Sequence, residues 1–203
     1  TVATNDSLLI FIGNSGVRYG GLIVDSDTEI ITIGDGLDLV SSPSPYKILF
    51  KTRDSAGNMS LATDTIEVTI DTEAPVVGDV LDLKATSDSG ISDIDNVTKI
   101  TTPVFTVSGL TPSKPTINLY YTKASDPDGT PEVLLMSHTM TKVQTDDISV
   151  PSSKALTEDV YTFTYTVSDS AGNVSNPSTS FEFTLDLTPP SVSVAPDLLD
   201  NGD

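Results

Sequence analysis

The chain has 203 residues, of which 29 are acidic and 10 are basic, so its formal net charge is −19 at pH 7. Nucleic acids and anionic membranes attract clustered Lys and Arg, and this balance argues against both as direct partners. With no Cys and a single His, the chain lacks the side chains for disulfides, for a zinc site built from several His or Cys, and for most nucleophile–base pairs.

A heptapeptide that occurs twice sets the internal register of the sequence. It reads DSAGNMS at 54–60 and DSAGNVS at 169–175, which is 115 residues later. The junction motifs that begin at Asp71 and Asp186 share this offset, and each has a Pro four residues on. One register that holds across separate features indicates an internal repeat.

The register predicts the domain boundaries. Residues 71–185 form one complete unit, long enough to bury its own core, and residues 186–203 begin a further unit. Residues 1–70 are either an equivalent unit cut short at its N-terminus or a genuinely shorter domain. The register favours the first interpretation, in which the chain is a segment of a longer array.

Alternating apolar and polar residues predict β-strands along the complete unit. From Tyr161 to Ser168, aromatic and β-branched residues alternate with Thr and Ser. No window keeps a helical period, and 13 Gly and 13 Pro separate the short runs. Seven strands are predicted in this unit, near 77–83, 103–108, 116–122, 132–138, 146–150, 160–168 and 180–186.

Seven short strands separated by turns predict an all-β fold built as a two-sheet sandwich. Tyr161 lies at the start of the sixth strand, where a tyrosine corner would be, and Tyr46 is its equivalent one repeat earlier. Ordinary core packing is the alternative for both. The two Asp-Ser-Ala-Gly-Asn segments are predicted hairpin turns, in which Gly57 and Gly172 supply positive φ.

The sequence resembles the immunoglobulin-like repeats of giant bacterial surface adhesins, including biofilm-associated and RTX-type adhesins. The resemblance rests on the Asp-x-x-x-Pro junction, on the segment SDSGISDIDN at 87–96, and on the sixth strand running into Asp-Ser-Ala-Gly-Asn. It covers 71–185 well, 40–70 fairly and 1–40 loosely. It implies tandem immunoglobulin-like β-sandwiches with about seven strands per unit.

The resemblance also implies a function. In such adhesins these repeats are extenders, which hold a ligand-binding tip away from the cell, often with calcium stiffening the joints. We therefore expect an extracellular segment without enzymatic activity, whose partners are neighbouring repeats, with any host or surface ligand bound by other parts of the parent protein. A sugar- or peptide-binding module and an accessory domain of an extracellular hydrolase remain open.

Acidic residues at the predicted joints suggest calcium, which takes six to eight oxygen ligands. The acidic loop from Asp88 to Asn96 does not have EF-hand spacing. The alternative to a calcium-binding loop here is a solvated acidic loop that binds no ion. Strand alternation predicts that acids from neighbouring units converge at each joint, where a divalent cation would relieve their repulsion. The candidate calcium ligands are Asp71, Glu73, Asp88, Asp93, Asp95, Asn96, Asp169, Asn173 and Asp186.

Catalysis has little support in the sequence. His138 is predicted to be a plain surface residue, and residues 126–129 an acidic hairpin turn. Residue types alone permit a carboxylate pair for glycoside hydrolysis, but the acids fall in predicted turns. The absence of Trp weakens a sugar-stacking platform, so we predict no enzyme.

Overall fold

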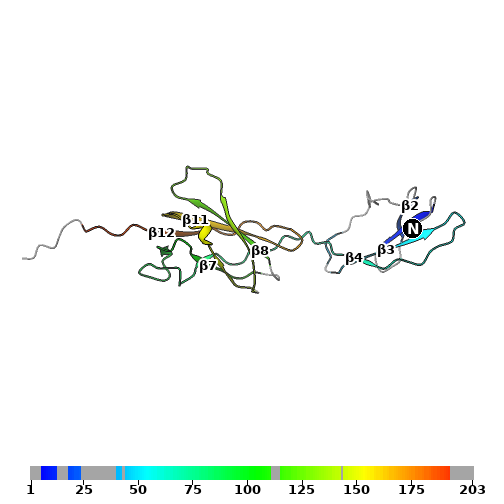
Figure 1. Ribbon diagram of the computed structural model, residues 1–203, viewed down its shortest axis with the longest axis horizontal. Coiled ribbons are helices and arrows are strands. Elements are labelled where there is room, and N and C mark those ends of the chain that lie inside the picture. Colours follow the sequence, from blue (N-terminus) through cyan, green and yellow to red (C-terminus); the bar gives the residue numbers. More distant parts are fainter. Residues whose placement is uncertain are drawn as a thin grey trace, which may run out of the picture. The chain divides into compact units, whose positions relative to one another are not determined.

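A computed structural model of the chain describes residues 6–12, 18–23, 40–42, 44–110, 115–142 and 144–192. The chain divides into two compact units between Glu73 and Ala74 (Figure 1). The regular structure of the described residues is β, apart from one short 3-10 turn, η1 (Ser152–Lys154). None of these residues forms a helix with the length and hydropathy that crossing a membrane requires.

The first unit contains a four-stranded antiparallel sheet with strand order β2-β1-β3-β4. Its strands are β1 (Ser7–Ile12), β2 (Arg18–Ile23), β3 (Tyr46–Arg53) and β4 (Ile66–Val68). Ile10, Ile12 and Ile48 form a small buried core. The described residues of this unit make one sheet only, so a second sandwich within the chain stays a prediction. Of residues 186–203, those from 193 onward lie outside the described residues.

The second unit is a sandwich of two sheets, with strand orders β10-β7-β5 and β6-β12-β11-β8-β9. All pairs are antiparallel except β6 with β12. Its strands are β5 (Asp82–Leu83), β6 (Val97–Thr98), β7 (Val104–Val107), β8 (Thr116–Lys123), β9 (Val133–Thr139), β10 (Asp146–Ser149), β11 (Asp159–Ser168) and β12 (Phe181–Leu185).

The all-β sandwich predicted for this unit is confirmed, and each of the seven predicted strands is present. The first is much shorter than expected, because only Asp82–Leu83 pairs with β7. The two-residue strand β6 was not predicted. It lies in a polar loop and is held by parallel pairing with β12, which local alternation cannot reveal.

Aromatic side chains fill the space between the two sheets. The inward residues of β11, which are Tyr161, Phe163, Tyr165 and Val167, are fully buried, whereas the residues between them are partly exposed. Phe105 of β7 comes from the opposite sheet, and its ring centroid lies 5.1 Å from that of Phe163. Such contacts add to the free energy of burial, because offset and edge-on ring pairs attract each other.

Tyr161 forms the predicted tyrosine corner. Its hydroxyl donates to the carbonyl oxygen of Thr157 at 2.8 Å and accepts from the Thr157 backbone N–H at 3.1 Å. In the first unit, Tyr46 donates to the Val40 carbonyl at 3.1 Å. Each hydroxyl therefore ties the start of a long strand to the segment that precedes it.

Removing the Tyr161 hydroxyl tests this corner. We expect Tyr161→Phe to lower the free energy of unfolding by about 1–2 kcal/mol, because the buried Tyr161 side chain loses its hydrogen bonds with the Thr157 backbone. Urea denaturation of the variant measures the change. Tyr120→Phe is the matched control, since no hydrogen bond involves that hydroxyl among the described residues, and an equal loss in both variants would contradict the role of the corner.

The buried core of the second unit also predicts that it folds independently. A fragment of residues 71–185 should unfold in a single cooperative transition by calorimetry, because it contains every residue of that core. A broad, non-cooperative profile in calcium-containing buffer would show that the fragment needs its neighbours.

Candidate functional site

The repeated heptapeptide forms the same hydrogen-bonded turn in both units. The Asp169 carboxylate accepts hydrogen bonds from the backbone N–H and the Nδ2 amide of Asn173, both at 2.9 Å. Asp54 binds Asn58 in the same way, at 2.8 Å for each bond. Asp169 and Asn173 are thus brought together as partners within one turn. Their spacing has a structural role that requires no ion.

Two further features stabilise these turns: a glycine with positive φ and an ionised aspartate. Gly57 and Gly172 have φ of +92° and +93°, as predicted for the hairpin. The side-chain hydrogen bond from Asn173 lowers the pKa of the Asp169 carboxyl below its ordinary value, outweighing the opposing effect of burial. The ionised carboxylate is the form that accepts these bonds, so the turn favours a negative charge at this position.

The two junctions repeat a second local motif. Asp71 Oδ1 accepts the backbone N–H of Glu73 at 3.1 Å, and Asp186 Oδ1 accepts that of Thr188 at 2.9 Å. Each turn leads into proline, which restricts the backbone that follows. Asp71 and Glu73 belong to the first unit, so their approach to Asp169 and Asn173 stays a prediction.

Two acids that the sequence analysis missed lie beside the second junction. Glu158 accepts hydrogen bonds from the hydroxyl of Thr188 at 2.8 and 2.9 Å, and from the backbone N–H of Leu187 at 3.2 Å. Asp159 accepts the backbone N–H of Ser125 at 3.3 Å. A shallow cavity here is lined by Ser125, Glu158, Asp159, Val160, Thr184, Leu185 and Asp186. Antiparallel pairing of β11 with β12 is the signal that could have predicted this convergence.

The acidic loop from Asp88 to Asn96 lies against the last strand. β6 continues from this loop and pairs in parallel with β12, and the backbone N–H of Asp186 donates to the Thr98 carbonyl at 2.9 Å. The Thr98 hydroxyl donates to the Ser87 carbonyl at 2.6 Å and closes the base of the loop. The loop and Asp186 therefore share the C-terminal end of the unit.

Asp88 is the buried acid of this loop, with an exposed fraction of 6%. Its Oδ2 accepts the backbone N–H of Asn96 at 3.0 Å, and Asn96 adopts a positive φ of 58°. Its Oδ1 is buried without a hydrogen-bond partner among the described residues. An ionised oxygen in that position costs free energy unless a water or a cation binds it.

Other oxygens crowd around Gly90 in the same loop. A Cβ on Gly90 would lie 3.0 Å from both Asp95 Oδ1 and the Val97 carbonyl oxygen, so glycine permits their close approach. Asp93 is exposed. Within the described part of the chain, no three acidic or histidine side chains group as a metal site. A calcium ion in this loop would therefore depend on backbone carbonyl oxygens as well as carboxylates.

His138 corrects one sequence prediction, because it is not a plain surface residue. Its Nε2 lies 3.3 Å from Asp146 Oδ2, and its side chain is only 23% exposed. Asp146 itself is buried and also accepts the backbone N–H groups of Thr141 at 2.6 Å and Asp147 at 3.0 Å. Burial opposes ionisation, yet these hydrogen bonds hold the pKa of Asp146 well below its usual range.

Comparison with known families agrees with the sandwich. Residues 76–187, more than half of the chain, match the bacterial Ig-like domain. The chain belongs to this family. The predicted relationship to immunoglobulin-like repeats is confirmed at that level, and no curated protein matches the chain.

Solved structures similar to this bacterial Ig-like protein have low identity. The FN1–FN3 domains of chicken CNTN1 are 15% identical over 89% of the chain, with a TM-score of 0.40. The tetra-tandem repeat in the extending region of a large adhesion protein is 18% identical over 92%, at 0.39. A Ca²⁺-stabilised adhesin of an ice-binding Antarctic bacterium is 20% identical over 90%, at 0.35. The chain spans 56%, 43% and 40% of their respective lengths.

Asp146 gives this bacterial Ig-like domain a testable acid sensitivity. Its pKa is depressed by folding, so its stabilisation is present above its unfolded pKa of about 3.9 and is lost as the pH falls below that value. We expect Asp146→Asn to lower the free energy of unfolding by about 2 kcal/mol near neutral pH, since a buried charge-assisted network is weakened. The difference from the parent protein should shrink near pH 2.5, well below the unfolded pKa.

Urea denaturation at both pH values measures this effect. Asp128→Asn removes an exposed carboxylate from the turn between β8 and β9, and it serves as the control for the change in net charge. A difference between Asp146→Asn and the parent that stays constant with pH would show that the charge of Asp146 does not stabilise the fold.

Proposed function

We propose that this chain is a structural extender segment of a secreted bacterial cell-surface adhesin, and that it has no catalytic activity. The observation that carries the proposal is the paired junction, in which Asp71 and Asp186 cap the same turn one repeat apart. The turn that precedes the second unit has the same geometry as the turn that follows it. Units with matching turns at both ends are suited to being joined end to end. Its direct partners would be neighbouring repeats of the same chain.

The hydrogen bonds of the acidic side chains support a non-catalytic role. Asp54, Asp146 and Asp169 all accept backbone N–H bonds within their own turns. Their pKa values are lowered, the direction opposite to that required of a general acid at neutral pH. The acids with strongly bonded carboxylates thus act as structural acceptors.

Small-angle scattering of the whole chain tests the extender role. A compact globule of this length would have a radius of gyration of about 17 Å. We expect a clearly larger value and an elongated distance distribution, because an extender must separate its ends. A radius near the compact value would contradict the proposal.

Calcium would stiffen the C-terminal joint by binding in the loop from Asp88 to Val97. The buried, unpartnered Asp88 Oδ1 is the observation that fits a cation there. Asp95 and the Val97 carbonyl, which converge on Gly90, would be further ligands, and Asp186 follows the strand that pairs with this loop. A bound cation would hold the loop against the last strand and so restrict the joint.

Calcium should raise the melting temperature of the chain relative to chelator. Extracellular modules bind calcium at about 10⁻⁴ to 10⁻³ M, so millimolar calcium is required. At 100 times the dissociation constant the stabilisation is about 2.7 kcal/mol per site, which shifts melting by several degrees. Calorimetry measures the shift.

Variants locate the ion. Asp88→Asn should abolish most of the shift, and Asp186→Ala should reduce it. Asp128→Asn makes the same charge change as Asp88→Asn outside the loop and should leave the shift intact. If about 10 mM calcium, above the affinity range of such modules, leaves the melting temperature unchanged, the loop does not bind calcium and the joint is held by packing and proline alone.

A further inference from the structure

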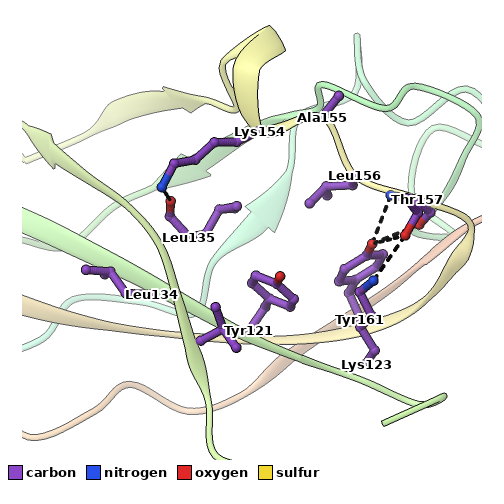
Figure 2. Close-up of a pocket in the computed structure, with 10 residues that line it drawn as sticks. Tyr121, Lys123, Leu134, Leu135, Lys154, Ala155, Leu156, Thr157 and Tyr161 are labelled. Carbon is purple, nitrogen blue, oxygen red and sulfur yellow. Dashed lines mark hydrogen bonds between the residues drawn. The ribbon is translucent and has the colours of Figure 1, made fainter.

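The second unit has a cavity of about 300 Å³ on one open side of its sandwich (Figure 2). It lies between β9, the edge strand of the larger sheet, and the segment that runs from η1 to the start of β11. Neither the turns that repeat along the chain nor the joints take part in it. The cavity therefore has no role in the extender function proposed above.

Apolar side chains form the walls of this cavity. Leu135, Leu156 and Tyr161 are buried, and the ring of Tyr121 lies beside them (Figure 2). Leu134 of β9 also lines the cavity but is 48% exposed, a high value for a large apolar side chain. The cavity therefore offers apolar surface to a ligand at a place that solvent reaches.

Two lysines border the apolar walls, and both donate to neutral oxygens. Lys154 Nζ donates to the Leu135 carbonyl, and Lys123 Nζ donates to the Thr157 hydroxyl at 3.0 Å (Figure 2). Lys123 Nζ also lies 5.6 Å from the centroid of the Tyr161 ring. Each ammonium has three donors, so each keeps donors for a further acceptor.

Neither ammonium forms an ion pair within the described ranges of the chain, although acids outnumber bases almost threefold. Lys84, in contrast, binds Asp147 at 2.6 Å. The pKa of Asp159 is lowered by its hydrogen bond with the Ser125 side chain and, to a smaller extent, by the charge of Lys123, so Lys154 is the cation less involved with acids. The two ammonium groups attract an anion locally, against the opposing field of a chain with a net charge of −19.

We propose that this cavity binds a small monocarboxylate with a compact apolar or aromatic body. The carboxylate would accept hydrogen bonds from Lys154, Lys123 or both, and the apolar body would lie against Tyr121 and Leu156. The volume is at the low end for ligand sites, which fits a body of one ring or a short branched chain. Free organic acids and the C-terminal residue of a peptide both have this chemistry.

The apolar walls argue against the other anions. A sugar acid has many hydroxyl groups, which would lose their hydration against leucine side chains without replacement partners. A phosphate group gains most from several convergent donors or an Arg fork, and no Arg lines the cavity. A carboxylate needs few donors and tolerates an apolar surrounding for the rest of the molecule.

Titration of the whole chain with 4-phenylbutyrate, followed by backbone amide NMR, tests the proposal. For a ligand of this size we expect a dissociation constant on the order of 1 mM. Saturable shifts should be confined to residues around Leu135 and Leu156. The neutral analogue 4-phenylbutyramide should bind at least about tenfold more weakly, since it lacks the charge, and acetate should not saturate.

A second arm separates the two ligand sources. N-acetylphenylalanine carries an amide next to the carboxylate and stands for a peptide C-terminus. Tighter binding of N-acetylphenylalanine indicates a peptide end, and tighter binding of 4-phenylbutyrate indicates a free acid. Either result supports the carboxylate site, whereas equal affinity for the acid and its amide, or no saturation by either acid, would overturn it.

Matched variants identify the cations. Lys154→Gln and Lys123→Gln should each weaken 4-phenylbutyrate binding by about tenfold, the usual effect of losing a charge-assisted hydrogen bond. Lys154→Arg should retain binding. Lys99→Gln removes an exposed charge outside the cavity and should have no effect. If Lys154→Gln fails to fold, Lys123→Gln and the acid-to-amide comparison decide the matter. Unchanged binding in Lys123→Gln together with equal affinities for the acid and the amide would refute the proposal.

Discussion

The contact of Phe105 with the aromatic residues of the facing sheet is the interaction on which the second unit depends. Phe105 lies 5.1 Å from Phe163 and 5.4 Å from Phe183, measured between ring centroids. Burying these rings requires every inward position of β11 to be apolar, and it forces the polar residues between them outward. The sandwich in turn fixes which loops share an end. The start of β11, the end of β12 and the loop before β6 meet at the C-terminal end because these strands are paired there.

Several carboxylates of the described residues accept hydrogen bonds from backbone N–H groups, and few form ion pairs with basic side chains. Asp54, Asp146 and Asp169 accept N–H groups that would otherwise lack partners in tight turns. The carboxylates thereby contribute to turn geometry, and their ionised forms are favoured over the protonated ones. Asp88 differs from them, because only one of its oxygens is bonded while the other is buried. This difference, and not the local density of acids, marks it as the residue to examine for a cation.

Sequence reasoning predicted the strands and the tyrosine corner because both rest on local signals. Alternation along β11 follows from one buried face, and Tyr161 has its partner only four residues upstream. It could not separate acids that cap turns from acids that bind ions, since Asp169 and Asp88 occur in similar polar contexts. It missed Glu158 and the contact of His138 with Asp146, because each depends on which strands pair across a sheet or loop. Strand β6 was not predicted for the same reason, since its pairing with β12 joins segments far apart in the chain.

The junction turns of the second unit and the open edge of its larger sheet are built from different residues and interactions. The turns at Asp71, before the second unit, and at Asp186, after it, share one hydrogen-bonded geometry in which the Asp carboxylate accepts the backbone N–H two residues on. On the open side, the outer edge of β9 pairs with no strand among the described residues, and Lys154 donates to the Leu135 carbonyl there. A lysine at a sheet edge discourages pairing with another chain, because its charge must stay hydrated or bound to an anion. The charge of Lys154 lies next to apolar surface, and this combination is the basis of the carboxylate binding proposed for this side of the domain. The proposed extender role and the proposed carboxylate site therefore involve different residues of the domain.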